Sequence, residues 1–342
     1  MKYLDKILAK YAPIKKIRNK YRQKIKSAKY FKIKNHLQFL LKDKYKDCYF
    51  IMSSNGLGDI FFIASSIEHF KNKKDGKVIF LLEKKSLIDF VKAFPAIDDV
   101  IYDKNFSTLL YAQNEIQQVI TKNDVNILRY PYRGKKENYT FADNYINMLG
   151  LEHNIKFSQP ILTENNYIVA KEEYRKLNIP ENKTIIIIPE CVMFNYKQLQ
   201  PEFWKNLAKK LERMGYKVVF NSKDKAYKNF RTTFLPITDF LAFAKMANHI
   251  YSFRSGISDV FTGLNIIHQT VIYPNNFEVL WADKLSLDLN CHRYHTKLYD
   301  YEFDNLKHIY SLNSNFNRND IYEIFYNGDK ENLEKELLMR IK

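Results

Sequence analysis

Three short segments contain residue types that could do chemistry, and two of them combine these residues with glycine. The first is Asn55-Gly56-Leu57-Gly58-Asp59, which follows an apolar run. The chain has nine glycines, so two within three positions predict a tight turn whose backbone N–H groups are open to an anion or substrate. Asp59 has two interpretations: a helix-capping residue that stabilises by about 1 kcal/mol, or a carboxylate that faces a cleft as a general base. The third glycine of G-x-G-x-x-G and the lysine of a P-loop are missing, which argues against dinucleotide binding.

The second segment begins with the isoleucine run 185–188. Such a run predicts a strand buried on both faces, and the carboxyl end of such a strand is where open α/β sheets bind ligands. Lys197 lies in the loop that follows. Taken alone, it is one surface lysine among many.

The third segment is Arg254-Ser255-Gly256-Ile257-Ser258-Asp259, where a strand is expected to end and a helix to begin. Ser255 could cap this helix, and Gly256 would let a ligand approach the backbone. Arg254 adds a planar, permanently charged fork that suits phosphate. The turn therefore predicts an anionic ligand, with an arginine paired to a structural carboxylate as the alternative.

Short apolar runs that alternate with amphipathic stretches predict α/β units with parallel strands. We expect strands near 48–53, 78–82, 100–102, 125–129, 184–189, 217–221, 249–253 and 270–273. Helices are expected to begin near Asp59, Leu87, Leu109, Phe141, Glu202, Asp239 and Ile257. Trp204 and Phe253 are interpreted as core residues rather than site residues.

The length of 342 residues favours two domains. We expect a basic arm at 1–46, a first doubly wound domain at 47–160, a linker region at 161–183, a second such domain at 184–318, and C-terminal amphipathic helices at 319–342 that could pack back on the first domain.

The net charge of +17 is concentrated in the arm. Residues 1–46 hold 16 lysines and arginines against two aspartates, and the remaining residues carry a net charge of only +3. Apolar residues recur there at three- and four-residue steps, which predicts a basic amphipathic helix that Pro13 divides. Three interpretations compete: a helix on anionic lipid, a nucleic-acid arm, and a solvated helix.

No stretch approaches the roughly 18 apolar residues that a membrane span needs. The three cysteines, Cys48, Cys191 and Cys291, are odd in number and far apart, which argues against a disulfide framework. We therefore expect a globular protein of the cytoplasm.

Taken in order, the three segments resemble the heptosyltransferase-like glycosyltransferases of family 9 over about residues 47–275. The resemblance rests on Gly56-Leu57-Gly58-Asp59, on Lys197 followed by Pro201 and Trp204, and on Ser255-Gly256-Ile257. It implies the GT-B fold, in which two Rossmann-like domains face a cleft. The N-terminal domain would bind the acceptor and the C-terminal domain the nucleotide sugar.

The chain also departs from that family. Arg254 and Asp259 stand where the family usually has an aspartate before the late turn and a histidine after it. The Arg-Ser-Gly form looks like that of variant members from capsule or O-antigen clusters. The resemblance thus implies an enzyme of surface-polysaccharide or lipopolysaccharide synthesis. If residues 1–46 lie on anionic lipid, they would hold it at the inner face of the cytoplasmic membrane, where lipid-linked acceptors lie.

The chemistry expected from the resemblance is an inverting displacement of a nucleoside diphosphate from a sugar, with a heptose among the candidate sugars. Asp59 would be the base, beside an acceptor loop of Asn55, Gly56 and Gly58. The diphosphate would be bound by Lys197, Arg254, Ser255, Gly256, Ile257 and Asp259. Glu278 is a candidate ribose ligand. The acceptor would be a glycan or lipid-linked glycan, and no metal or cofactor is expected.

Other interpretations of the chain stay open. Asp300-Tyr301-Glu302-Phe303-Asp304 has only a superficial likeness to the D-x-D motif of metal-dependent transferases, and Cys291, His292 and His295 offer too few soft ligands for zinc. The protein could be a catalytically silent GT-B-like module that binds sugar nucleotide or polysaccharide within an assembly complex. Nucleic-acid binding through the arm is a third, less favoured reading.

Overall fold

The structure, a computed structural model, describes most of two α/β units. The described residues are 17, 19–21, 23, 28, 45, 47–52, 56–104, 126–129, 141–152, 155, 157–190, 199–253, 255–264, 266, 268–274, 321–326, 330–339 and 341. Nearly all of the predicted basic arm lies outside these residues. Within them, no helix is long and apolar enough to cross a membrane.

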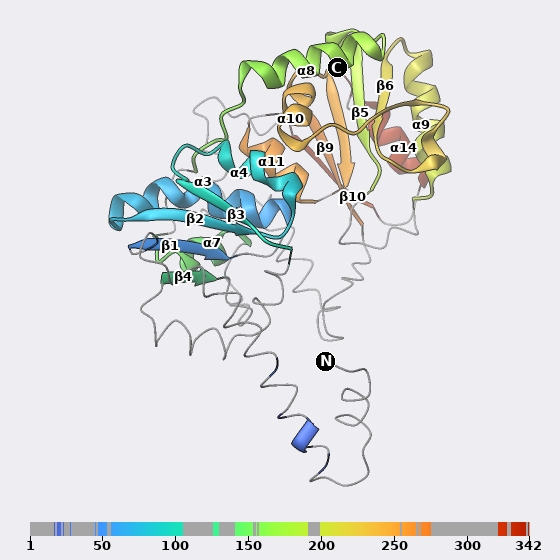
Figure 1. Cartoon of the computed structure of the whole chain (residues 1–342). Coiled ribbons are helices and arrows are strands. Elements are labelled where there is room, and N and C mark those ends of the chain that lie inside the picture. Colours follow the sequence, from blue (N-terminus) through green and yellow to red (C-terminus); the bar gives the residue numbers. More distant parts are fainter. Residues whose placement is uncertain are drawn as a thin grey trace.

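The first unit is built on a four-stranded parallel sheet (Figure 1). Its strands are β1 (Cys48–Met52), β2 (Lys77–Leu82), β3 (Asp99–Tyr102) and β4 (Asn126–Arg129). They lie in the order β3-β2-β1-β4. The central strands are formed by short apolar runs. Parallel strands are covered on both faces, so side chains on either side of the strand are buried and must be apolar. The unit's helices are α3 (Leu57–Lys73), α4 (Ile88–Lys92) and α7 (Phe141–Met148).

The second unit is built on a six-stranded parallel sheet. Its strands are β5 (Thr184–Ile188), β6 (Lys217–Asn221), β7 (Arg231–Thr233), β8 (His249–Phe253), β9 (Gln269–Pro274) and β10 (Ile321–Tyr326). They lie in the order β10-β9-β8-β5-β6-β7. Counted within each unit, both sheets begin with the strand order 3-2-1-4. This is the doubly wound order, which places ligands where the order reverses, beside β1 and β4 or beside β5 and β8.

The predicted strands are confirmed to within one or two residues at their ends. The predicted helices are confirmed as α3, α4, α7, α9 (Pro201–Arg213), α10 (Ile237–Lys245) and α11 (Gly256–Gly263), while the one expected near Leu109 lies outside the described residues. In α9, Trp204, Leu207, Ala208 and Leu211 are fully buried. This spacing puts them on one helical face against the second sheet.

The segment predicted as a linker contains a helix, α8 (Glu164–Lys176). Thr163 and Asn166 form a capping box at its start. The helix packs on α10, where the Tyr174 ring lies 4.4 Å from that of Phe243. It buries only three side chains, so its apolar periodicity in the sequence is weak.

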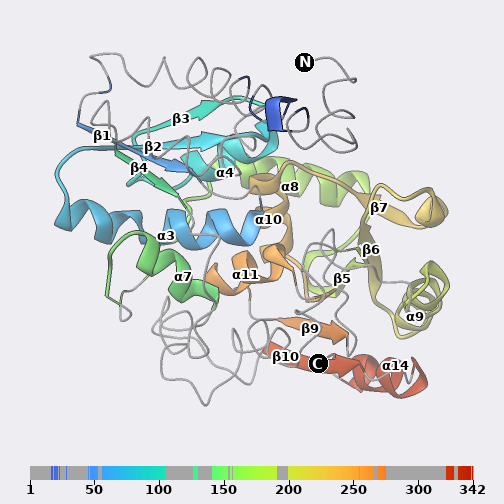
Figure 2. The same ribbon diagram turned by 90° about the horizontal axis from the view of Figure 1, so that it is seen from below.

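The C-terminal stretch was predicted as helices that could pack on the first domain. One helix is confirmed, but the first part of the stretch is a strand and the helix packs on the second unit. Residues 321–326 form β10, which pairs in parallel with β9, and α14 (Lys330–Met339) follows. Five of the six β10 residues are β-branched or aromatic, which favours a strand. Leu333 and Leu337 of α14 are buried in the same apolar cluster as Trp204. The helix therefore covers the second sheet beside α9 (Figure 2).

The two units meet chiefly through α3 and α11, which lie side by side between the sheets (Figure 2). One apolar cluster runs through this contact, with Ile60 and Phe61 from α3 and Val260 and Phe261 from α11, all fully buried. A second cluster, around Trp204, belongs to the second unit alone. The α3–α11 contact brings two of the three predicted segments together.

Candidate active site

The first glycine turn opens α3. Gly56 is extended, with φ −76° and ψ 135°, and is the N-cap residue of the helix, with no side-chain hydrogen bond to the cap. Its carbonyl accepts the first helical hydrogen bond from Ile60 N–H at 3.1 Å. Asp59 lies in the first turn, where a negative charge interacts favourably with the helix dipole. Asn55, predicted to belong to the acceptor loop, lies outside the described residues.

The carboxylate of Asp59 has a partner on another helix. Tyr145 of α7 donates its hydroxyl hydrogen to Asp59 Oδ1. Asp59 is thus not the N-cap residue of its helix, and its side chain is held by a tertiary contact. Tyr145 was missed in the sequence, because its spacing within α7 is that of an ordinary core residue.

The second glycine turn opens α11. Ser258 Oγ accepts a hydrogen bond from Ser255 N–H at 3.0 Å and donates one to Ser255 O at 2.6 Å. Ser258 therefore provides the side-chain hydrogen bonds of this turn, whereas the sequence suggested that Ser255 would cap the helix. The Ser255 Oγ atom is buried and has no hydrogen-bond partner in the structure as described. A hydroxyl in that state at a helix start is available to a ligand atom.

The two turns touch through their backbones. A Cβ atom on Gly58 would lie 2.5 Å from Asp259 Oδ2 and 3.1 Å from Gly256 Cα, and one on Gly256 would overlap the backbone nitrogen of Gly58. Only glycine fits at both positions. The N-termini of α3 and α11, each with partial positive charge, therefore converge at this contact.

Asp259 was predicted to contact the diphosphate, but it lies inside the α3–α11 contact. It is 1% exposed, and its carboxylate lies over the first turn of α3 beside Gly58. A carboxylate is favourable there because it faces the positive end of a helix. In this arrangement Asp259 is not open to a nucleotide.

The remaining predicted residues divide into three groups. Ile257 is partly buried against the apolar cluster that spans both units. Lys197, Arg254 and Glu278 lie outside the described residues, as do the residues of the D-x-D-like segment. Trp204 and Phe253 are core residues, as predicted, with exposures of 0% and 1% and rings in edge-to-face contact at 5.5 Å.

A polar pair that the sequence did not indicate lies at the carboxyl ends of β5 and β6. Ser222 Oγ donates to Glu190 Oε1 at 2.6 Å and accepts a hydrogen bond from Asp224 N–H at 2.9 Å. Glu190 follows β5 directly and is exposed. The pair lies on the edge of the sheet where doubly wound folds bind ligands.

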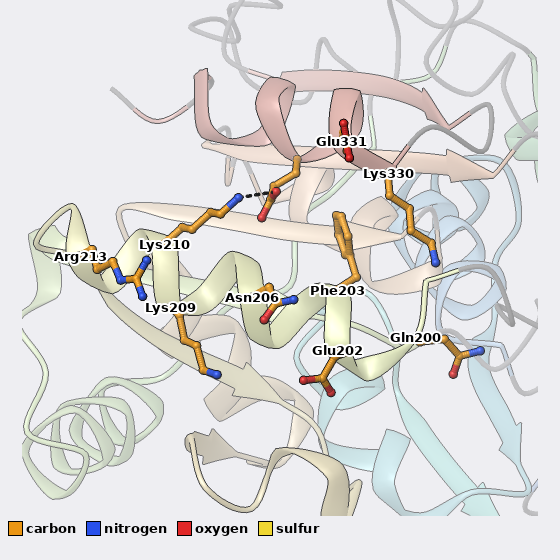
Figure 3. A pocket seen from close by; sticks show the side chains of 10 residues that line it. Gln200, Glu202, Phe203, Asn206, Lys209, Lys210, Arg213, Lys330 and Glu331 are labelled. Atoms are coloured by element: carbon orange, nitrogen blue, oxygen red, sulfur yellow. Dashed lines mark hydrogen bonds and ion pairs between the residues drawn. The ribbon is translucent and has the colours of Figure 1, made fainter.

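A pocket of about 420 Å³ lies between α9 and α14 (Figure 3). Residues of both charges line it, including Lys209, Arg213, Lys330 and Glu331. The ion pair between Lys210 and Glu334, at 2.6 Å, lies in its wall. None of its residues belongs to the glycine turns, so it is no part of the candidate active site. Among the described residues, no three His, Cys, Asp or Glu side chains are grouped to bind a metal.

The fold has solved counterparts. The structure of ADP-heptose lipopolysaccharide heptosyltransferase II from E. coli is similar with a TM-score of 0.57, at 11% identity, over 86% of this chain and 98% of that one. The family 9 glycosyltransferase of Veillonella parvula DSM 2008 is similar with a TM-score of 0.53, at 16% identity, over 86% of this chain and 96% of that one. No family model and no curated protein sequence matches the chain.

The chain has the GT-B fold. The expected fold class, two Rossmann-like doubly wound units of the GT-B type, is thereby confirmed. In this GT-B chain the turn after β1 provides Asp59 and the turn after β8 provides the start of α11. The contact between Gly58 and Gly256 places both turns at one point between the halves.

Proposed function

We propose that this chain is a glycosyltransferase. It would move a sugar from a nucleoside diphosphate donor to a glycan or lipid-linked glycan of the bacterial surface. The observation that carries the proposal is the contact of the two glycine turns, which brings the start of α3, with Asp59 in its first turn, against the start of α11 in the other half. The likeness in fold to two transferases over most of their length supports it.

The first half would activate the acceptor. Asp59, in the first turn of α3, would accept the proton of the attacking hydroxyl, since a carboxylate at a cleft can act as a general base. A direct attack on the anomeric carbon breaks its bond to the diphosphate oxygen, and one such displacement inverts the anomeric configuration. The proton ends on Asp59 and the negative charge on the departing diphosphate.

The second half would stabilise that departing charge. The backbone N–H groups at the start of α11 and the unpartnered Ser255 hydroxyl are suited to bind phosphate oxygens. Lys197 and Arg254, from loops after β5 and β8, would add two positive charges in the role that a divalent ion has in other transferases. Asp259 is left out of this set because it is buried against α3.

A donor screen with purified protein tests the proposal. Nucleoside diphosphate sugars, ADP-heptose among them, are offered with lipid-linked glycan acceptors, and release of nucleoside diphosphate is followed. Asp59→Asn should lower turnover by about 10² to 10⁴ and leave donor affinity unchanged. Arg254→Ala should instead weaken donor binding.

Asp89→Asn is the matched control, because Asp89 also lies in the first turn of a helix in the same half. It should behave as wild type. Nucleotide binding with no turnover, indifferent to Asp59→Asn, would favour a catalytically silent binding module.

The basic arm supports a location at the membrane. With a net charge of +14 over 46 residues, it should bind vesicles that contain anionic lipid. Deleting residues 1–46, or raising the salt, should release the protein, while donor binding persists. Equal binding to neutral vesicles would argue against the electrostatic attraction. Binding to nucleic acid in preference to vesicles would favour the hypothesis that residues 1–46 bind nucleic acid.

A further inference from the structure

Tyr145 is fixed along one face of α3. It is 2% exposed, and its ring stacks on Phe62 at 6.1 Å with an interplanar angle of 8°. Its hydroxyl donates to Asp59 Oδ1. Because Phe62 and Asp59 are three residues apart on α3, the ring and the hydroxyl of Tyr145 contact the same helical face.

The Tyr145 ring cannot turn away easily. Phe62, on which it stacks, is itself fully buried and contacts Phe61 and Phe157 at 5.4 and 6.0 Å between ring centroids. A side chain that is packed in this way holds its rotamer, and a rigid donor fixes the acceptor that it binds. The orientation of the Asp59 carboxylate is therefore determined by α7 as well as by α3.

We propose that Tyr145 is the positioning residue of the general base. Its hydroxyl holds Asp59 Oδ1, orients the carboxylate, and favours its ionised form, which is the form that can accept a proton. The inference rests on the proposed function, since it assigns Tyr145 a role in the same site. A phenylalanine would fill the same space, so the hydroxyl itself is what the proposal concerns.

The charges around the start of α3 explain why such a donor is useful. Among the described residues, two titratable groups from other helices lie at this end of α3: Tyr145 from α7 and Asp259 from α11, whose Oδ2 lies beside Gly58. A second carboxylate near Asp59 disfavours its ionised form, whereas a hydrogen bond donated to Asp59 favours it. The hydrogen bond from Tyr145 would therefore favour the form of Asp59 that can accept a proton.

Tyr145→Phe tests the proposal in two ways. With donor and acceptor, kcat should fall about tenfold, with the donor KM within about twofold of wild type, and the acid limb of the pH profile should move to higher pH. Without substrate, carbon-13 NMR should show the Asp59 carboxyl group titrating about one pH unit higher in the variant. Asp59→Asn identifies the Asp59 signal.

Tyr174→Phe is the matched control. Tyr174 is also a buried tyrosine, and its hydroxyl donates to Phe243 O at 3.2 Å, away from the site. It should leave kcat and the Asp59 titration unchanged even where it lowers the melting temperature. The same loss of kcat in both variants, or an unchanged Asp59 titration in Tyr145→Phe, would overturn the positioning role.

A failure of the proposed function can be distinguished from a failure of the inference about Tyr145. If Asp59→Asn transfers sugar at the wild-type rate, Asp59 is not the base and the inference about Tyr145 falls with it. If Asp59→Asn is inactive while Tyr145→Phe matches wild type in kcat and in titration, only the role of Tyr145 is overturned.

Discussion

The two halves of this chain share a strand order and differ in where the site residues lie within it. In the first half the glycine turn follows β1, the first strand of its sheet, and presents a carboxylate. In the second half the turn follows β8, the fourth strand in the same order, and presents a helix start and a serine hydroxyl. Both turns flank the point where the strand order reverses. One fold can therefore place either a carboxylate or a helix start at the contact of the halves, depending on which strand carries the glycine turn.

The halves also differ in how their cores are connected. The cluster around α3 and α11 continues from one half into the other, whereas the cluster around Trp204 lies within the second half. A change in the shared cluster should affect both sheets, and a change in the second cluster should affect one.

Core truncation should give the largest effect. Phe61→Ala, in the shared cluster, and Trp204→Ala, in the second cluster, should each lower the free energy of unfolding by about 3–5 kcal/mol. Hydrogen exchange should then rise in β2 and β6 alike for Phe61→Ala, but mainly in β6 for Trp204→Ala. Identical exchange patterns for the two variants would show that the halves unfold as one unit.

A change at the contact between Gly58 and Gly256 should give the next largest effect on stability. Gly256→Ala should lower the free energy of unfolding by about 2–3 kcal/mol, because the added Cβ atom meets the backbone of Gly58 in the other half. Gly150→Ala is the control: it has open space but a φ of +65°, so it should cost only about 1 kcal/mol of backbone strain. Urea unfolding compares the two, and equal losses would remove the steric argument.

The halves should respond to acid in different pH ranges. Burial, with a smaller contribution from His268, lowers the pKa of His249 in β8 to about 3. His249 therefore stays neutral in the folded chain, while the unfolded chain binds a proton below about pH 6.5. The contribution of neutral His249 to the free energy of unfolding is fully present above that pH. It should decrease by about 2 kcal/mol between pH 7 and pH 5.

The first half should lose stability only in stronger acid. Burial acts to raise the pKa of Asp98, but hydrogen bonds from Lys71 and Val78 N–H outweigh it and lower that pKa. The stabilisation from Asp98 is present above the ordinary carboxyl pKa and is lost below it, near pH 4 and under. Urea titrations of His249→Gln should show a flatter pH dependence between pH 7 and pH 5 than those of the wild type. An unchanged slope in His249→Gln would contradict this assignment.

The smallest effect concerns the C-terminal helix. Tyr251 in β8 donates its hydroxyl to Leu337 O of α14 at 2.6 Å. Tyr251→Phe should lower the free energy of unfolding by about 1 kcal/mol and raise hydrogen exchange in α14, because that carbonyl loses a buried donor. Tyr174→Phe should loosen α8 instead. Loosening of the first half by Tyr251→Phe would contradict the placement of α14.

Local signals in the sequence predicted the strands and the glycine turns well. The isoleucine run 185–188 indicates a buried strand without help from distant residues, whereas glycine is required at position 58 because of the contact with Gly256 and Asp259. The segment 321–326 was predicted as a helix because its apolar spacing suits both structures, and pairing with β9 decided between them. Helix α8 was missed because its stability comes mainly from packing on α10.

The site was predicted less completely than the fold, for a physical reason. Residue type and spacing pointed to Asp59 and to the turn at Gly256, since glycine turns at strand ends are local features. The hydrogen bond from Tyr145 and the burial of Asp259 depend on how α7 and α11 approach α3. No pattern along the chain encodes that approach.

The contact of Gly58 with Gly256 also has a mechanical consequence. Where backbone meets backbone there is no side chain to change rotamer, so the distance between the starts of α3 and α11 is set by the radii of backbone atoms. The spacing of the two halves at this point therefore cannot be adjusted by a side chain.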